Sequence, residues 1–142
     1  MHLAVAGTFA LPYTAYLFLL SARVSRLRVA NEKWLGSSCK NVEASTDTDP
    51  LEVAVRSHAN YMENMPYAFL LAGIVELNGG NRKVLTGSLA ALLLFRIIHV
   101  ELGLRSEGAK ASPRLYGHVG TAGFLAGMSA YALYLVKGYW GF

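Results

Sequence analysis

Apolar residues concentrate in four stretches of this chain, and this pattern limits the folds that it can adopt. The first stretch, from about Leu3 to Ala22, is long enough as a helix to cross the roughly 30 Å of hydrocarbon in a bilayer. Hydrophobic residues make up 54% of the 142 residues and charged residues only 15%, against roughly 25% charged in a soluble domain. A soluble protein of this size cannot bury so much apolar surface. The sequence therefore predicts an all-α integral membrane protein, folded as one four-helix bundle over residues 1–142.

Local signals give the boundaries of the spans. Asp49 and Pro50 form a helix start, with a carboxylate N-cap before a first-turn proline, and Asn78, Gly79 and Gly80 supply the turn that ends a helix. The basic residues near the first stretch follow its apolar core instead of preceding it, so we expect a retained span rather than a signal peptide. We expect spans at about residues 3–22, 50–78, 84–104 and 113–136, with a cytosolic polar loop at 23–49.

Basic residues indicate the orientation of the spans. The positive-inside rule places the first and third loops in the cytosol and both termini on the opposite side. Because these residues lie beside apolar segments, the net charge of +4 does not indicate nucleic-acid binding. The cytosolic set is Arg23, Arg26, Arg28, Lys33, Lys40, Arg56, Arg105, Lys110 and Arg114, and the opposite set is Arg82, Lys83 and Lys137.

Glycines mark the last span. Gly123 and Gly127 have the small-xxx-small spacing that lets another helix approach closely. The alternative is that they are scattered membrane glycines without a defined interface.

Polar residues at the start of the second span are the strongest sign of a functional site. In a helix, Arg56, Asn60 and Glu63 lie along one face. Ionisable groups at membrane depth are costly, so their presence there suggests a functional site. Antiparallel spans bring further polar residues to the same end. Guanidinium groups bind carboxylates and Glu63 accepts an ammonium, so this end suits a small ligand with carboxylates and an amine. The gathered residues are Arg26, Arg28, His58, Arg96, His99, Arg114, Tyr116 and His118. Arg28 and Arg105 have a simpler interpretation, as basic residues that anchor span ends at the interface.

Four spans, a long polar first loop and one motif resemble the MAPEG family, the membrane-associated proteins of eicosanoid and glutathione metabolism. The motif opens the second span and reads Arg56-x-His58-x-Asn60-x-x-Glu63-Asn64-x-Pro66. A second match is Arg96-x-x-His99 near the end of the third span, followed by Pro113 and Arg114. The resemblance covers nearly the whole chain in order and spacing.

The resemblance implies a homotrimer of four-helix subunits that binds glutathione, as co-substrate, at subunit interfaces on the cytosolic side. The matching positions that would bind glutathione are Arg26, Arg56, Asn60, Glu63 and His99, and Arg114 would face the sulfur as the catalytic residue. A guanidinium beside a thiol favours the thiolate, which is the reactive nucleophile. The implied activity is that of a glutathione transferase or peroxidase, acting without a metal on lipophilic electrophiles from the bilayer. An endoplasmic reticulum or other intracellular membrane is expected, with a bacterial inner membrane as the alternative.

Three departures from the family pattern favour a general transferase or peroxidase over a dedicated eicosanoid synthase. Gly103 stands where prostaglandin E and leukotriene C synthases of the family have a tyrosine, Leu115 replaces a serine, and Ala59 replaces a basic residue. Tyr116 and His118 are the candidates for the missing hydrogen bond to the sulfur. Two other functions stay open, a non-catalytic lipid-binding scaffold of the same family and a small transporter or channel. The polar residues gather at one membrane end, which argues against a transport path.

Overall fold

The computed structural model describes residues 2–38, 49–105 and 111–141. Its helices are α1 (Ala4–Ala30), α2 (Pro50–Leu77), α3 (Arg82–Ile97), the π-helix η1 (Ile98–Leu104), α4 (Ala111–Val136) and the short 3-10 helix η2 (Lys137–Trp140). No strand occurs in the described part of the chain. The predicted all-α fold is confirmed.

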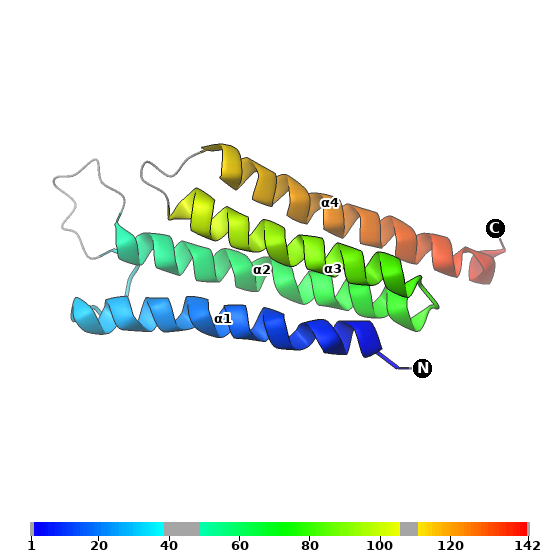
Figure 1. The fold of residues 1–142 in the computed structure, drawn as a ribbon, viewed down its shortest axis with the longest axis horizontal. Coiled ribbons are helices and arrows are strands. Elements are labelled where there is room, and N and C mark those ends of the chain that lie inside the picture. Colours follow the sequence, from blue (N-terminus) through cyan, green and yellow to red (C-terminus); the bar gives the residue numbers. More distant parts are fainter. Residues whose placement is uncertain (1, 39–48, 106–110, 142) are drawn as a thin grey trace.

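The long helices run antiparallel in turn, so both termini lie at one end of an elongated bundle (Figure 1). α2 and α3 form the middle of the bundle: α1 packs against α2 and α3, and α4 packs against α2, α3 and η1. The end that holds Arg23, Arg56, Glu101 and Arg114 is called the polar end below. The opposite end, which holds Glu76 and the chain termini, is called the terminal end.

Helix boundaries follow local capping chemistry. The Asp49 carboxylate accepts a hydrogen bond from the Leu51 amide at 2.8 Å at the start of α2, and Gly79 adopts a φ of 81° just after its end, as expected. α1 differs from its prediction because it continues past residue 22 to Ala30. The arginines after residue 22 are good helix formers, so the change in composition there does not stop the helix.

A π-helix follows α3 and was not predicted. In η1 the Arg105 amide donates to the carbonyl of Val100, five residues earlier, at 3.0 Å. The wider turn places His99, Glu101 and Gly103 within one short segment. π-turns inside helices are rare and frequently mark functional sites.

Tyrosines supply the polar contacts of an otherwise apolar core. The Tyr13 hydroxyl donates to the Leu89 carbonyl at 2.8 Å, and the Tyr61 hydroxyl donates to the Tyr13 carbonyl at 2.9 Å. Water is absent from hydrocarbon, so a buried hydroxyl there must find its partner within the protein. These two bonds fix α1 against both middle helices.

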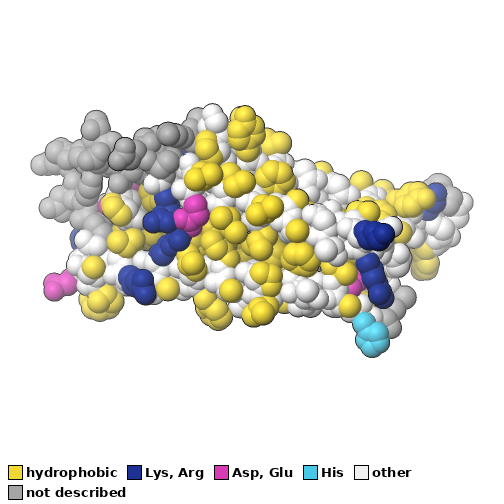
Figure 2. Space-filling view, viewed as in Figure 1, with side chains coloured by type: hydrophobic (Ala, Val, Ile, Leu, Met, Phe, Trp, Pro, Cys, Tyr) yellow, Lys and Arg dark blue, Asp and Glu magenta, His cyan; other side chains and the backbone are white. Residues whose placement is uncertain are grey.

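The outer surface is suited to lipid. Three helical segments of the described chain are long and apolar enough to cross a membrane, namely Ala4–Ala30, Arg82–Leu104 and Ser112–Trp140. Figure 2 shows apolar side chains across the middle of one face and charged side chains toward its two ends. α2 does not reach the same apolarity because polar residues such as Asn60, Glu63 and Asn64 interrupt it, so its crossing of the membrane stays a prediction.

A carboxylate from α2 caps the start of α1. Glu76 accepts hydrogen bonds from the amides of Val5 and Ala6, at 2.7 Å and 2.9 Å, one with each oxygen. The α1 N-cap residue, Leu3, offers no side-chain cap of its own. Glu76 therefore satisfies amides that a helix start leaves unpaired, and its charge opposes the positive end of the helix dipole.

We expect Glu76→Ala to lower the free energy of unfolding by about 1–2 kcal/mol, because two amides lose a charged acceptor. Thermal or denaturant unfolding in mild detergent measures the loss. Glu52→Ala is the matched control, since its ion pair with Arg56 is exposed and such pairs contribute about 0–1 kcal/mol. Equal losses in the two variants would contradict the capping role of Glu76.

Candidate functional site

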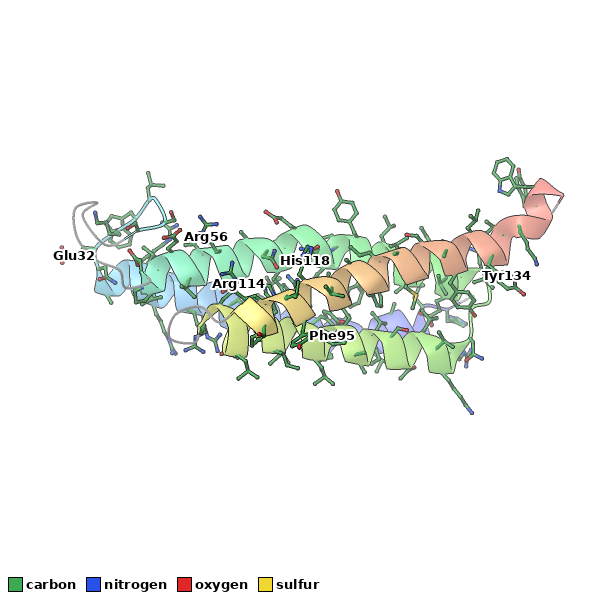
Figure 3. All side chains as sticks on the ribbon, turned by 90° about the horizontal axis from the view of Figure 1, so that it is seen from above. Glu32, Arg56, Phe95, Arg114, His118 and Tyr134 are labelled. Atoms are coloured by element: carbon green, nitrogen blue, oxygen red, sulfur yellow. The ribbon has the colours of Figure 1, made fainter. Side chains whose placement is uncertain are left out.

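Most of the residues expected to bind a ligand lie in the half of the bundle next to the polar end, but few of them touch within one chain. Figure 3 shows Arg56, Arg114 and His118 toward the end where α2 and α4 begin. Arg26, Arg56, Glu63 and Arg114 are all exposed. Asn60 is partly buried and His99 is buried. The predicted residues therefore form an exposed charged set and two less exposed residues, Asn60 and His99.

Arg96 connects the middle helices near this end. Its side chain is only 2% exposed, and one terminal nitrogen donates to both the backbone carbonyl and the side-chain oxygen of Asn60, at 2.7 Å and 2.5 Å. The other terminal nitrogen donates to the Thr121 hydroxyl at 3.3 Å. The guanidinium also lies 5.9 Å from the centre of the Tyr61 ring. One buried cation therefore joins α2, α3 and α4.

This contact changes the expected role of Asn60. Its side-chain oxygen accepts a hydrogen bond from Arg96, so its side-chain nitrogen is the group that we expect to contact a ligand. The side-chain amide of Asn64 donates to the backbone carbonyl of Asn60 at 2.8 Å, the same carbonyl that accepts from Arg96. Asn60 is thus held rigidly, and its position depends on Arg96.

The charged residues beside Asn60 on α2 remain available. Glu63 is exposed and interacts electrostatically with Arg96. Arg56 forms an exposed ion pair with Glu52, one turn earlier, with an N–O distance of 2.9 Å. The ion pair is weak enough in water for a ligand carboxylate to compete with it.

His99 and Arg114 are neighbours across the η1–α4 contact. His99 Nδ1 lies 3.0 Å from the carbonyl oxygen of Arg114. Gly117 makes this approach feasible, because a Cβ there would lie 2.3 Å from the His99 Cβ. Gly120 allows the Phe95 ring to approach in the same way, because a Cβ on Gly120 would lie only 2.6 Å from the nearest ring atoms.

The close helix contacts within the chain therefore involve Gly117 and Gly120, and not the predicted pair of Gly123 and Gly127. A Cβ on Gly123 or Gly127 would meet nothing within 4 Å. Both residues are exposed on α4.

Gly103 also fits closely under the start of α4. A Cβ on Gly103 would lie 2.9 Å from Arg114 Cγ and 3.1 Å from its backbone nitrogen. A tyrosine at this position, as expected for the prostaglandin E and leukotriene C synthases of the resembled family, would not fit without moving α4. The close packing of Arg114 against Gly103 therefore leaves no room for a tyrosine side chain at this position.

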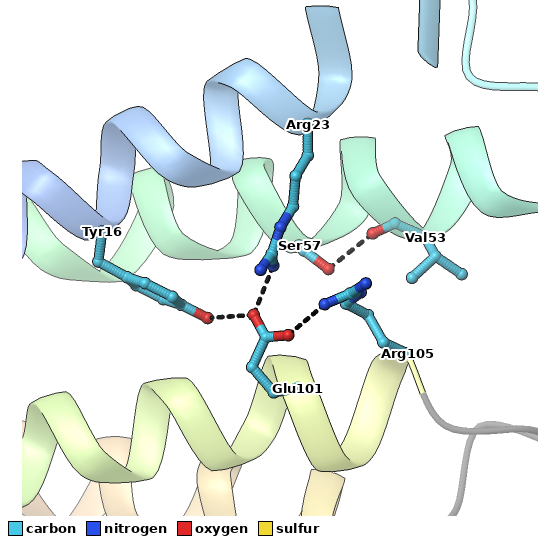
Figure 4. Close-up of polar contacts among 6 residues, drawn as sticks. All are labelled: Tyr16, Arg23, Val53, Ser57, Glu101 and Arg105. Atoms are coloured by element: carbon cyan, nitrogen blue, oxygen red, sulfur yellow. Dashed lines mark hydrogen bonds and ion pairs between the residues drawn. The ribbon is translucent and has the colours of Figure 1, made fainter. Parts of the chain in front are cut away.

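A second polar cluster holds α1 to η1 (Figure 4). The Glu101 carboxylate forms ion pairs with Arg23 of α1 and with Arg105, and it accepts a hydrogen bond from the Tyr16 hydroxyl at 3.3 Å. All three partners contact one partly buried carboxylate. Such a network orients the end of η1, and with it His99 and Gly103.

The sequence placed Arg96 at this end but did not show that Arg96 joins α2, α3 and α4. The ion pair between Glu101 and Arg23 was not predicted either. An acidic residue near the end of an apolar span, with arginines at the end of the neighbouring span, was the available signal for that pair. Arg26 has no contact with the other predicted residues among those described above, and the structure leaves its role untested.

The sequence between residues 6 and 134 matches the model of the MAPEG family. The match extends from the first turn of α1 into the last turns of α4, and it includes every residue of the polar clusters described above. No curated protein and no solved structure matches the chain significantly.

We expect Gly117→Ala to destabilise the bundle by about 1–3 kcal/mol, since the added carbon overlaps His99 and forces η1 and α4 apart. Gly123→Ala is the matched control. Its methyl group enters open space, and the higher helix propensity of alanine gives a neutral or slightly stabilising change. Thermal unfolding of both variants in detergent measures the difference, and equal midpoints would contradict the close η1–α4 contact.

Arg96→Lys should reduce stability by about 1–3 kcal/mol although the charge is kept. A lysine ammonium cannot reach Asn60 and Thr121 together, so buried acceptors lose their donors. Arg105→Lys, at a half-exposed position, should change the unfolding midpoint much less. If the two substitutions have the same effect, Arg96 does not organise this end.

Proposed function

Because this chain belongs to the MAPEG family, we propose that it is a membrane-bound glutathione transferase or peroxidase that acts on lipophilic electrophiles. Its family and its three apolar helices make it an integral membrane protein of eicosanoid or glutathione metabolism. One observation carries the finer proposal. Exposed Arg26, Arg56, Glu63 and Arg114 lie in the half of the bundle that also holds the Asn60–Arg96 contact.

The charges of this set match those of glutathione. The tripeptide has two carboxylates, one ammonium, two peptide groups and a thiol. Arg26 and Arg56 would bind carboxylates through their paired N–H groups, and Glu63 would accept the ammonium. The amide nitrogen of Asn60, held in place by Arg96, would donate to a peptide carbonyl.

Arg114 would favour the thiolate of bound glutathione. An ordinary thiol has a pKa near 8.5 and is mostly protonated at neutral pH. A guanidinium beside the sulfur stabilises the charged form and lowers the pKa of the thiol. The thiolate then attacks an electrophilic carbon to form a thioether, and the electrophile either loses its leaving group or takes up a proton. With a hydroperoxide it attacks the terminal oxygen and breaks the O–O bond, which gives glutathione sulfenic acid and, after protonation, an alcohol. A second glutathione then reduces the sulfenic acid to yield glutathione disulfide and water. His99 would line the site and hold the Arg114 backbone through the contact at Nδ1.

A second copy of the chain would complete the site. Glu63 and Arg56 are exposed on the single chain, on the α2 face that also exposes Tyr67 and Leu70. A carboxylate that faces hydrocarbon is costly, so another subunit or the ligand must cover this face. The homotrimer that the family resemblance implies would supply that cover. It would also place glutathione between subunits.

The basic residues support a cytosolic location of the polar end. Those at the terminal end are fewer, namely Arg82, Lys83 and Lys137. Lys40 and Lys110 of the cytosolic set lie outside the described residues. Glutathione would then enter from the cytosol while the electrophile enters from the lipid. An endoplasmic reticulum or other intracellular membrane suits this arrangement, and a bacterial inner membrane suits it as well.

A non-catalytic, lipid-binding scaffold is the second candidate. The close packing of Gly103 against Arg114 favours it, because no tyrosine hydroxyl can stand beside the sulfur there. Tyr116 and His118 are exposed on α4 within two turns of the helix start, and either would supply a hydrogen bond to the sulfur in the enzyme.

The decisive experiment measures glutathione conjugation to a hydrophobic electrophile by the purified chain in detergent. We expect Arg114→Ala to lower kcat by about a hundredfold, because the thiolate loses its counter-charge. Glu63→Gln should weaken glutathione binding by about tenfold or more, with a smaller effect on kcat. Lys33→Ala, an exposed basic residue near the polar end, is the control and should leave both values unchanged.

Thermal unfolding separates the two candidate functions. A ligand that binds only the folded state raises the unfolding midpoint. Glutathione should raise it for the wild type and less for Glu63→Gln. No turnover together with stabilisation by lipid alone would contradict the enzyme and favour the scaffold.

A further inference from the structure

The π-helix η1 has different contacts on its two sides. Residues two positions apart on a helix do not face the same way, so Glu101 points away from His99 and Gly103. Glu101 contacts α1, where it pairs with Arg23 and accepts a hydrogen bond from the Tyr16 hydroxyl at 3.3 Å. His99 and Gly103 instead face the start of α4. η1 is therefore bound to α1 on one side and packed against α4 on the other.

Arg114 of α4 is held by η1 on both sides of its Cα atom. Its carbonyl oxygen lies 3.0 Å from His99 Nδ1. Its amide nitrogen lies beside Gly103, where a Cβ would come within 3.1 Å of that nitrogen and 2.9 Å of Arg114 Cγ. The Arg114 side chain is exposed and takes part in no ion pair among the residues that the structure describes. The direction of its guanidinium thus depends on where η1 places the Arg114 backbone.

Side chains, and not the backbones, join η1 to α1. Within the described residues, no Cα atom of α1 lies within 8 Å of a Cα atom of η1. The Glu101 carboxylate crosses this separation, with Arg23 and Tyr16 on one oxygen and Arg105 on the other (Figure 4). Its side chain is 25% exposed, against 41% for Glu52 in the pair on the α2 surface. Water and salt therefore screen the attraction between Glu101 and Arg23 less.

The geometry of η1 requires such a contact from outside the helix. π-turns are rare, and helices in proteins gain most of their stability from tertiary packing. The amide of Arg105 closes the wide turn by donating to the Val100 carbonyl, and the guanidinium of the same arginine binds Glu101. Glu101 thus binds both the residue that closes the π-turn and the helix beside it.

We propose that Glu101 is a positioning residue, which holds η1 so that the Arg114 guanidinium faces the sulfur of bound glutathione. This inference rests on the proposed function, in which Arg114 stabilises the thiolate. Glu101 does not touch the ligand. It acts through the contacts that His99 and Gly103 make with the Arg114 backbone.

Turnover of the full chain in detergent, with glutathione and a hydrophobic electrophile, tests this role. Glu101→Gln keeps the size of the side chain and removes its charge, so the pairs with both arginines weaken. We expect kcat to fall by about tenfold, because a displaced guanidinium stabilises the thiolate less. KM for glutathione should change by less than about twofold, since Arg26, Arg56 and Glu63 lie on other helices.

A double substitution shows whether Glu101 acts through Arg114. In an Arg114→Ala background the guanidinium that Glu101 positions is absent, so Glu101→Gln should cause little further loss of kcat. The ultraviolet absorbance of bound thiolate at neutral pH gives a second measurement. It should be lower in Glu101→Gln than in the wild type, because less of the bound glutathione is ionised.

Two single variants complete the set. Arg23→Gln removes the same link from the α1 side, at a partly exposed position, and should lower kcat in the same direction, so the test does not depend on one variant. Glu32→Gln is the matched control. Glu32 is exposed and has no ion pair in the described ranges, so its loss of charge should leave kcat and KM unchanged.

Two kinetic results would overturn the proposal. One is a wild-type kcat in Glu101→Gln, and the other is the same fold loss from Glu101→Gln with and without Arg114. A wild type that forms neither thioether nor bound thiolate contradicts the proposed function itself. Hydrogen exchange of the η1 amides then tests the structural step separately. Faster exchange in Glu101→Gln than in Glu32→Gln supports the link through Glu101, and equal exchange contradicts it.

Discussion

The helix arrangement depends on the hydrogen bonds that the bundle provides to one buried cation. Arg96 is nearly inaccessible, in a protein whose surroundings offer no water to solvate a charge. Its bonds to Asn60 and Thr121 therefore fix the relative positions of α2, α3 and α4. Its Nε atom has no partner among the described residues, so this contact is costly as well as specific. Because the Arg96 charge is expensive to bury, few other helix arrangements could provide it with hydrogen-bond partners. The need for these partners therefore limits the helices to one register near the polar end.

Composition and capping residues were sufficient to predict the topology. Apolar stretches gave the number of helices, Asp49 with Pro50 gave the start of α2, and Gly79 gave its end. These signals are local, because capping and helix propensity depend on residues a few positions apart. The apolar span was placed at residues 3–22, where the composition changes, and the helix itself continues beyond that span to Ala30. A helix in water and a helix in lipid have the same backbone geometry, so polarity alone does not locate a helix end.

The contacts of the candidate site were not predictable in the same way. The sequence placed Arg56, Asn60 and Glu63 on one helix face, but it did not show that Asn60 turns toward Arg96 whereas Arg56 pairs with Glu52. These choices depend on residues in other helices. The π-turn of η1 is equally non-local, since it brings Glu101 to Arg23 while His99 remains beside Arg114. The glycines needed for this approach, Gly117 and Gly120, look no different in the sequence from Gly123 and Gly127.

The Glu76 contact has a consequence for the order in which the protein assembles. Its carboxylate lies in the last turns of α2, whereas the amides that it bonds belong to the first turns of α1. A chain made from its N-terminus presents α1 to the membrane long before Glu76 is synthesised. The first helix start therefore remains without this cap until the second helix is complete. Formation of the contact joins the end of α2 to the start of α1 and so closes the first hairpin.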